Sequence, residues 1–301
     1  MNKAKWTFVC LLFLALGLST SSCEKSCSDT VWYRDVDGDG IGNLRDSLVD
    51  CSQPEGYVSE GGDLADLIVE AKQRVVIPYV GATWCPPCGS FGEDTKAYIS
   101  ENFSPDDAII ISSQRGTINP SRVNVAYKFG DAFMQEFGAA GIPWMFAAGG
   151  GDAYDFYPNT SVVDFRLPSI LDLGPSVGIH ADATLGASQV DVNVKVQFYE
   201  AKATDYYVSV YLLEDDVKAD QRHSTLGIVE DMPHNNILRE GASNSNYHGQ
   251  SIGSSFTANQ AVKRSYQISL RPEWDANNLK VVAIVWEGNG TQIMNAHLVD
   301  L

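Results

Sequence analysis

The sequence predicts two folded regions, an α/β domain over residues 63–170 followed by an all-β sandwich over residues 176–301. In the first region, helix and strand signals alternate, and this order is typical of a layered α/β domain. In the second region, strands follow one another without helices between them, which favours a sandwich. The chain of 301 residues is also longer than a usual single domain.

In the α/β region, some segments repeat apolar residues at helical spacing and others form short apolar, β-branched runs. The predicted helices cover Asp63–Gln73, Cys88–Asn102 and Val123–Phe137. The predicted strands cover Arg74–Gly81, Ala108–Ser112 and Trp144–Ala148. Strands of this kind are buried on both faces, so the helices are expected to cover them.

The second region alternates apolar and polar residues, as half-buried strands do. The predicted strands are Gly178–Ala183, Gln189–Phe198, Asp205–Leu213, Val262–Leu270, Leu279–Trp286 and Gln292–Val299. Two long segments, Glu214–Pro233 and Gly241–Ala258, are predicted to be loops. Long loops in compact domains are often functional, so we expect these to choose binding partners.

The first 22 residues have the features of an export signal. Lys3 and Lys5 precede the apolar run Trp6–Leu18, which is too short to span a bilayer but suits a signal sequence. Small residues then lead to Cys23, so residues 19–23 resemble a lipobox and Cys23 is the predicted lipidation site. The alternative is ordinary cleavage, with Cys23 merely nearby.

The remaining cysteines are even in number, as in exported proteins that form disulfides. Cys10 leaves with the signal and Cys23 is assigned to lipid, which leaves Cys27, Cys51, Cys85 and Cys88. The simplest pairing is a structural Cys27–Cys51 bridge and a redox-active Cys85–Cys88 bridge. No thiol is left over in this arrangement.

The strongest chemical signal is Trp84-Cys85-Pro86-Pro87-Cys88, directly after a predicted strand and at the start of a helix. Thiol–disulfide exchange needs a thiolate and a nearby second thiol, and two intervening residues at a helix N-terminus provide both. The helix dipole stabilises a thiolate at Cys85, which we expect to be exposed, while Cys88 lies one turn inside. The alternatives are a structural disulfide or half of a zinc site, which would need two further ligands.

This motif, together with Gly141-Ile142-Pro143 before a later strand, resembles the thioredoxin superfamily over residues 63–170. The resemblance implies that Cys85 and Cys88 are catalytic, with Cys85 reacting first and Cys88 resolving. It also implies a cis peptide bond before Pro143, with Ile142 and Pro143 presenting the substrate beside Trp84. A simple loop proline is the alternative for Pro143.

One position departs from the thioredoxin pattern. Thioredoxins carry a buried acid six residues before the first cysteine, and Tyr79 stands there in this chain. Efficient turnover is therefore in doubt, because that acid moves protons for the resolving thiol.

The order of segments resembles the outer membrane protein 28-related lipoproteins, with a signal, a lipid cysteine, a thioredoxin-like domain and an Ig-like β-sandwich. The matching stretches are residues 205–215, which begin Asp-Tyr-Tyr-Val-Ser-Val, residues 234–239, His-Asn-Asn-Ile-Leu-Arg, and Met294-Asn295-Ala296. The resemblance implies a cell-envelope, outer-membrane location, on either the periplasmic or the surface face. It implies no biochemical activity.

The tether of residues 23–62 contains an Asp-rich loop that fits a calcium site. Carboxylate, amide and carbonyl oxygens at this spacing are calcium ligands, and clustered carboxylates need a cation to offset their repulsion. The predicted ligands are Asp35, Asp37, Asp39, Ile41 through its carbonyl, Asn43 and Asp46. Calcium would be structural here; the alternative is a solvated acidic turn.

The net charge of −17 argues against nucleic-acid binding, and the sequence predicts no organic cofactor. The expected partners are the membrane, reached through the N-terminal lipid, and a protein thiol or disulfide. We therefore expect an outer-membrane-anchored lipoprotein that exchanges disulfides through Cys85 and Cys88. The alternative is a surface binding or structural lipoprotein that keeps the thioredoxin scaffold without turnover.

Overall fold

The computed structural model of the chain describes residues 29–36, 40–62, 69–119, 129–243, 246–288, 290 and 292–301. Cys23 and Cys27 therefore lie outside the described residues, as do Asp37 and Asp39 of the expected calcium loop. None of the described helices has the length and apolar character to cross a membrane.

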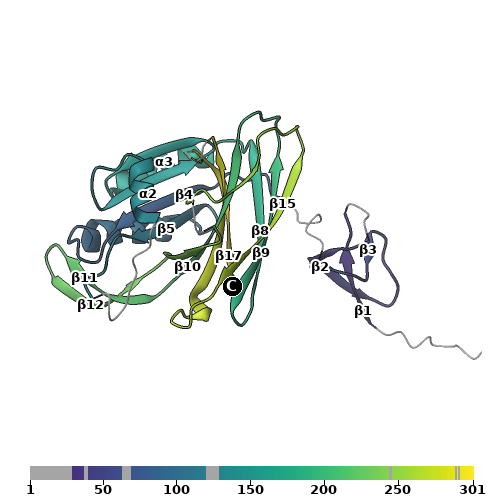
Figure 1. Cartoon of the computed structure of the whole chain (residues 1–301), viewed down its shortest axis with the longest axis horizontal. Helices are drawn as coiled ribbons and strands as arrows, with labels where there is room; N and C mark the ends of the chain where they lie inside the picture. The colour runs from purple at the N-terminus through teal and green to yellow at the C-terminus, as the bar shows by residue number, and fades with distance from the viewer. Residues whose placement is uncertain are drawn as a thin grey trace, which may run out of the picture.

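The described chain is mainly β-structure, and one large mixed sheet dominates it (Figure 1). Nine of the described strands form this sheet, in the order β17-β16-β10-β13-β5-β4-β6-β7, with β14 paired to β10. From the α/β region come β4 (Val75–Gly81), β5 (Ala108–Gln114), β6 (Trp144–Gly149) and β7 (Asp152–Phe156). From the second region come β10 (Tyr206–Glu214), β13 (Ile237–Gly241), β14 (Gln250–Gly253), β16 (Leu279–Glu287) and β17 (Gln292–Asp300).

Three smaller sheets complete the described strands. The tether forms β1 (Thr30–Arg34), β2 (Asn43–Asp50) and β3 (Tyr57–Val58). The β-sandwich is closed by β8 (Val177–Leu185), β9 (Gln189–Phe198) and β15 (Ala261–Ser269). A two-stranded hairpin contains β11 (Val217–His223) and β12 (Gly227–His234).

The helices cover both faces of the strands around β4. They are η1 (Cys88–Gly92), α1 (Glu93–Asn102), α2 (Phe129–Glu136) and α3 (Thr160–Leu171), besides a short turn η2 (Ala276–Asn278). Ile99 of α1 and Leu167 of α3 pack with Ile77 on one face of β4. Phe133 of α2 packs with Val76 on the other face. Side chains alternate between the two faces of a strand, and both faces of β4 are covered, so β4 is buried along its whole length.

Sheet β8-β9-β15 packs against strands β10, β16 and β17 of the large sheet and so forms the β-sandwich (Figure 1). The strands of the large sheet that face the sandwich also complete the core of the α/β region. Trp286 and Tyr211, on the other face of β16 and β10, lie in the same buried cluster as Val80 and Phe133. The hydrophobic core therefore continues from the α/β region into the second region, across the boundary that the sequence predicted at residues 170–176.

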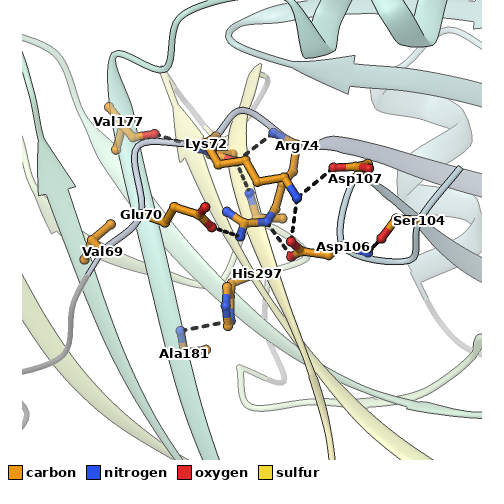
Figure 2. Close-up of polar contacts among 12 residues, drawn as sticks. Val69, Glu70, Lys72, Arg74, Ser104, Asp106, Asp107, Val177, Ala181 and His297 are labelled. Atoms are coloured by element: carbon orange, nitrogen blue, oxygen red, sulfur yellow. Dashed lines mark hydrogen bonds and ion pairs between the residues drawn. The ribbon is translucent and has the colours of Figure 1, made fainter. Parts of the chain in front are cut away.

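A polar junction holds the start of β4 against the loop before β5 and against the second region (Figure 2). Arg74 is 2 % exposed, and its Nε donates to Asp106 Oδ1 at 2.8 Å. Lys72 Nζ lies 2.6 Å from Asp106 Oδ2. Asn295 of β17 donates from Nδ2 to the carbonyl oxygens of Lys72 at 2.9 Å and Val177 at 3.0 Å. Asn295 thus joins the two regions, since it belongs to the second and bonds Lys72 in the first. Its bond to Val177 is buried, where an unpaired polar group would be costly.

Three predicted elements differ from the structure, and one of them is the expected loop Gly241–Ala258, which contains strand β14. Residues 69–74 are not helical, so the C-terminal part of the expected helix Asp63–Gln73 is wrong, and residues 63–68 lie outside the described chain. The segment Glu214–Pro233, predicted to be a loop, contains most of the β11–β12 hairpin. Its strand β11 is buried but contains the polar residues Asp220 and Gln221. It therefore lacks the alternation of apolar and polar residues by which strands were predicted.

Candidate functional site

The cysteine motif lies where the central strand β4 leaves the sheet. β4 pairs in parallel with β5 and antiparallel with β6, so the segment after Gly81 emerges between their ends. Cys85 and Cys88 form a disulfide with a Cα–Cα distance of 5.3 Å. The structure therefore brings the two cysteines together at the start of η1, where the N–H of Cys88 also donates to the carbonyl oxygen of Cys85 at 3.1 Å.

The first helical turn is a π-turn, in which the N–H of Gly92 donates to the carbonyl oxygen of Pro87 at 3.1 Å. The N–H of Cys88 lies 3.2 Å from Cys85 Sγ and points at it. This N–H would stabilise a thiolate at Cys85, because a backbone donor at a helix N-terminus favours negative charge.

Tyr79 fills the space beneath this turn. Its side chain is fully buried, and its hydroxyl donates to the carbonyl oxygen of Cys88 at 3.4 Å. Gly92 is required opposite, because a Cβ atom there would collide with the Tyr79 hydroxyl. Burial, reinforced by the charge of Glu93, raises the pKa of Tyr79 well above its usual range. Tyr79 therefore stays neutral and supports the backbone of Cys88 where thioredoxins have an acid.

The Ile142–Pro143 peptide bond is cis and lies beside the disulfide. The carbonyl oxygen of Ile142 is 3.9 Å from Cys85 Sγ. Trp84 is 48 % exposed, whereas Cys85 is only 3 % exposed. The expectation of an exposed Cys85 is therefore wrong, because Cys85 packs with Ala82, Cys88 and Ile142, and the β11–β12 hairpin packs against the residues around it.

The sequence analysis missed the hairpin residues that contact the cysteine motif. Gln221 Nε2 donates to the carbonyl oxygen of Cys85 at 3.1 Å, and the N–H of Arg222 donates to the carbonyl oxygen of Thr83 at 2.7 Å. The Ser224 and Ser90 hydroxyl oxygens are 2.8 Å apart. No local signal could have revealed these contacts, because they join residues more than a hundred positions apart.

A buried charged group on helix α1 was also missed. Glu93 Oε1 lies 2.9 Å from Lys96 Nζ and 3.6 Å from His234 Nδ1 of β12. Burial opposes ionisation of Glu93, but Lys96 and His234 outweigh it and lower the pKa of the carboxyl. Acid and base three residues apart on a helix could have suggested the Glu93–Lys96 pair, but not its burial.

A family comparison identifies the chain. The model of the family described as outer membrane protein Omp28 matches residues 131–300, more than half of the sequence. The chain belongs to the Omp28 family. Membership places the protein at the outer membrane, as the sequence predicted. A search of curated proteins found no match.

Solved structures of other proteins also match parts of this Omp28-family chain. HBP35 of Porphyromonas gingivalis is similar with a TM-score of 0.60 and 15% identity, covering 78% of this chain and 77% of that chain. At this identity the likeness extends to the fold alone. A domain of the outer membrane lipoprotein Omp28 from Porphyromonas gingivalis matches at 20% identity over 42% of this chain and 88% of that chain. Its TM-score of 0.29 supports no conclusion.

In the tether of this Omp28-family protein, the expected calcium ligands are only partly described. Asp35 Oδ2 accepts from the N–H of Gly40 at 3.0 Å, which closes the loop. At the other end, Asp46 Oδ2 is 3.4 Å from Arg34 Nη1. Ile41 and Asn43 lie between them. Among the residues that the structure describes, no three His, Cys, Asp or Glu side chains form a metal-holding group.

The other predicted bridge is partly described. Cys51, just after β2, is disulfide-bonded. Its predicted partner Cys27 and the predicted lipidation site Cys23 both lie outside the described residues, so this pairing and the lipid attachment stay predictions.

Proposed function

We propose that this Omp28-family protein exchanges thiols and disulfides through Cys85 and Cys88. The observation that carries the proposal is the disulfide at the helix start, with Cys85 Sγ 3.9 Å from the carbonyl of the cis Ile142–Pro143 bond. The strands and helices around β4 support a thioredoxin-like arrangement of residues 63–170. A lipid on Cys23 would hold this region at the outer membrane.

The proposed reaction starts when a substrate thiolate attacks Cys85 Sγ. The Cys85–Cys88 bond breaks, and Cys88 leaves as a thiolate that takes up a proton. A second substrate thiolate then attacks the substrate sulfur of the mixed disulfide and releases Cys85 as a thiolate, which also takes up a proton. Two electrons and two protons thus pass from a substrate dithiol to the protein, and the reverse reaction reduces a substrate disulfide.

The reduction potential of Cys85–Cys88 in the full chain tests this function. We expect a value between about −120 and −270 mV, the range of exchange proteins. A value below roughly −300 mV would mark a structural bridge and contradict the proposal. A Cys88→Ser variant should trap mixed disulfides with protein partners, and Cys85→Ser is the matched control that should trap none.

The second candidate is a binding or structural lipoprotein without turnover. The low exposure of Cys85, 3 %, and Tyr79 in place of an acid favour it. This candidate predicts a potential in the structural range and no mixed disulfides in Cys88→Ser. The same two measurements therefore separate the two functions.

We also propose that the loop of residues 35–46 binds Ca²⁺ and stiffens the tether. The described oxygens fit in part, since Asp35 and Asp46 lie at the two ends of the loop. Calcium would compete with Arg34 for Asp46, so we expect modest affinity.

A further inference from the structure

The β11–β12 hairpin holds the cysteine motif on the side of β5. Three contacts described above attach it, through Gln221, Arg222 and Ser224. Gln221 itself is 1 % exposed. A buried amide that satisfies backbone carbonyls is costly to displace, because those carbonyls would then lose their partner.

Close packing at Gly89 adds to this attachment. A Cβ atom on Gly89 would collide with the carbonyl oxygen of Arg222 and with the Gln221 side chain. The base of the hairpin is held as well, by His234 against Glu93. Contacts at strand β11 and at the base of the hairpin therefore hold the hairpin against the start of the helix.

The cis Ile142–Pro143 bond lies on the opposite side of the disulfide. It directly precedes β6, and β6 and β5 flank β4 on its two sides. The disulfide thus lies between the hairpin and this loop, which explains why Cys85 and Cys88 are 3 % and 1 % exposed. From the burial of Cys85 among the described residues, we expect a thiol to reach it on a narrow carrier or after the hairpin moves, because exchange requires access to the sulfur.

Large exposed apolar side chains gather around this point. Among the described residues from 69 onward, the exposed large apolar side chains are Trp84, Phe91, Tyr157, Phe165, Leu226 and Ile228. Trp84 and Phe91 flank the disulfide in sequence, and the Tyr157 ring centroid is 6.2 Å from that of Phe91. Ile228 pairs with Arg222 in the hairpin, and Leu226 is in its turn. Phe165, on α3, instead lines a pocket with Phe156 and Arg166.

We propose that the hairpin makes this site selective for cysteines in extended, apolar segments of unfolded polypeptide. This inference rests on the proposed exchange function. An extended segment is thin enough to bring its sulfur between the hairpin and Ile142, and its apolar side chains would contact Trp84, Phe91, Leu226 and Ile228. The surface of a folded protein would first have to displace Gln221. Gln221 is then a positioning residue that sets specificity, and it takes no part in the bond exchange.

The test measures how fast three thiols reduce the disulfide of the oxidised full chain: dithiothreitol, an apolar cysteine peptide, and a folded protein with one surface cysteine. Alkylation and mass analysis follow each reaction. For the unmodified chain, we expect the peptide to react at least about tenfold faster than the folded protein. Gln221→Ala and Gly89→Ala loosen the hairpin in different ways. Each should lower the ratio of the peptide rate to the folded-protein rate by about tenfold.

Apolar recognition is tested with Leu226→Ser/Ile228→Ser, which should slow the peptide by about tenfold and leave dithiothreitol unaffected. Phe165→Ser is the matched control and should change neither rate. Equal rates for peptide and folded protein on the unmodified chain would overturn the inference, as would unchanged selectivity in Gln221→Ala. If dithiothreitol also fails to reduce the disulfide, the exchange function itself is contradicted. Loss of selectivity alone contradicts only the inference about the hairpin.

Discussion

Ile237 of β13 pairs in parallel with Ser112 of β5, and this bridge joins strands of the two predicted regions into one sheet. The N–H of Ser112 also donates to the carbonyl oxygen of Asn236 at 2.8 Å. Trp286 of β16 also shares a buried cluster with Val80 of β4. The strands near the cysteines are therefore supported by residues far along the chain.

We expect residues 69–301 to unfold in a single transition because of this shared sheet and core. Urea unfolding followed by far-ultraviolet circular dichroism and by tryptophan fluorescence should give coincident curves. A chain that ends at residue 175 should lack cooperative unfolding, since it would expose the face that packs on β10 and β16. Two separate transitions in the full chain would contradict the prediction.

The Glu93–Lys96 pair should matter for stability because both groups are largely removed from water. Lys96→Met leaves the Glu93 carboxylate without its closest cation, and we expect a loss of about 3 kcal/mol in the free energy of unfolding. The double variant Glu93→Gln/Lys96→Met should cost less than the sum of the single changes. Lys263→Met, at an exposed lysine, is the control. An additive double variant would show that the pair is not coupled.

Stability should also fall in acid through Asp106. Burial opposes its ionisation, but hydrogen bonds from Arg74 and Lys72 outweigh burial and lower the pKa of Asp106 from 3.8 to about 2. A depressed carboxyl pKa stabilises the fold above pH 3.8, and this contribution is lost as the pH falls towards 2.

Because Asp106 is 45% exposed, we expect its contribution to be only roughly 0.2–1 kcal/mol. Urea unfolding at several pH values should show a shallower acid slope for Asp106→Asn. Asp172→Asn, at an exposed carboxyl with no ion pair among those described, should keep the original slope. An unchanged slope in Asp106→Asn would contradict the assignment.

Calcium binding by the tether is testable by calorimetry. We expect a dissociation constant of about 10⁻⁴–10⁻³ M, as for extracellular modules. Asp37→Asn/Asp39→Asn should abolish binding, whereas Glu55→Gln, an exposed acid in the same tether, should leave it unchanged. Binding that survives the double change would place calcium elsewhere.

Local patterns were sufficient to predict nine of the seventeen described strands. Gln189–Phe198 alternates buried residues with half-buried or exposed ones along its length, and β9 has those bounds. The run that became β4 is apolar throughout because both of its faces are covered. The hairpin was missed because Gln221 and His234 are polar yet buried, and only their distant partners make such burial tolerable.

The sequence by itself determined the spacing of Cys85 and Cys88, their position between a strand and a helix, and the membership of the chain in the Omp28 family. These follow from neighbours along the chain. Only the tertiary structure decided that Cys85 is buried and that Tyr79 supports Cys88, and only it joined the two regions in one sheet. Those features depend on contacts such as Gln221–Cys85 and Ile237–Ser112, which form between segments that the chain separates and that packing brings together.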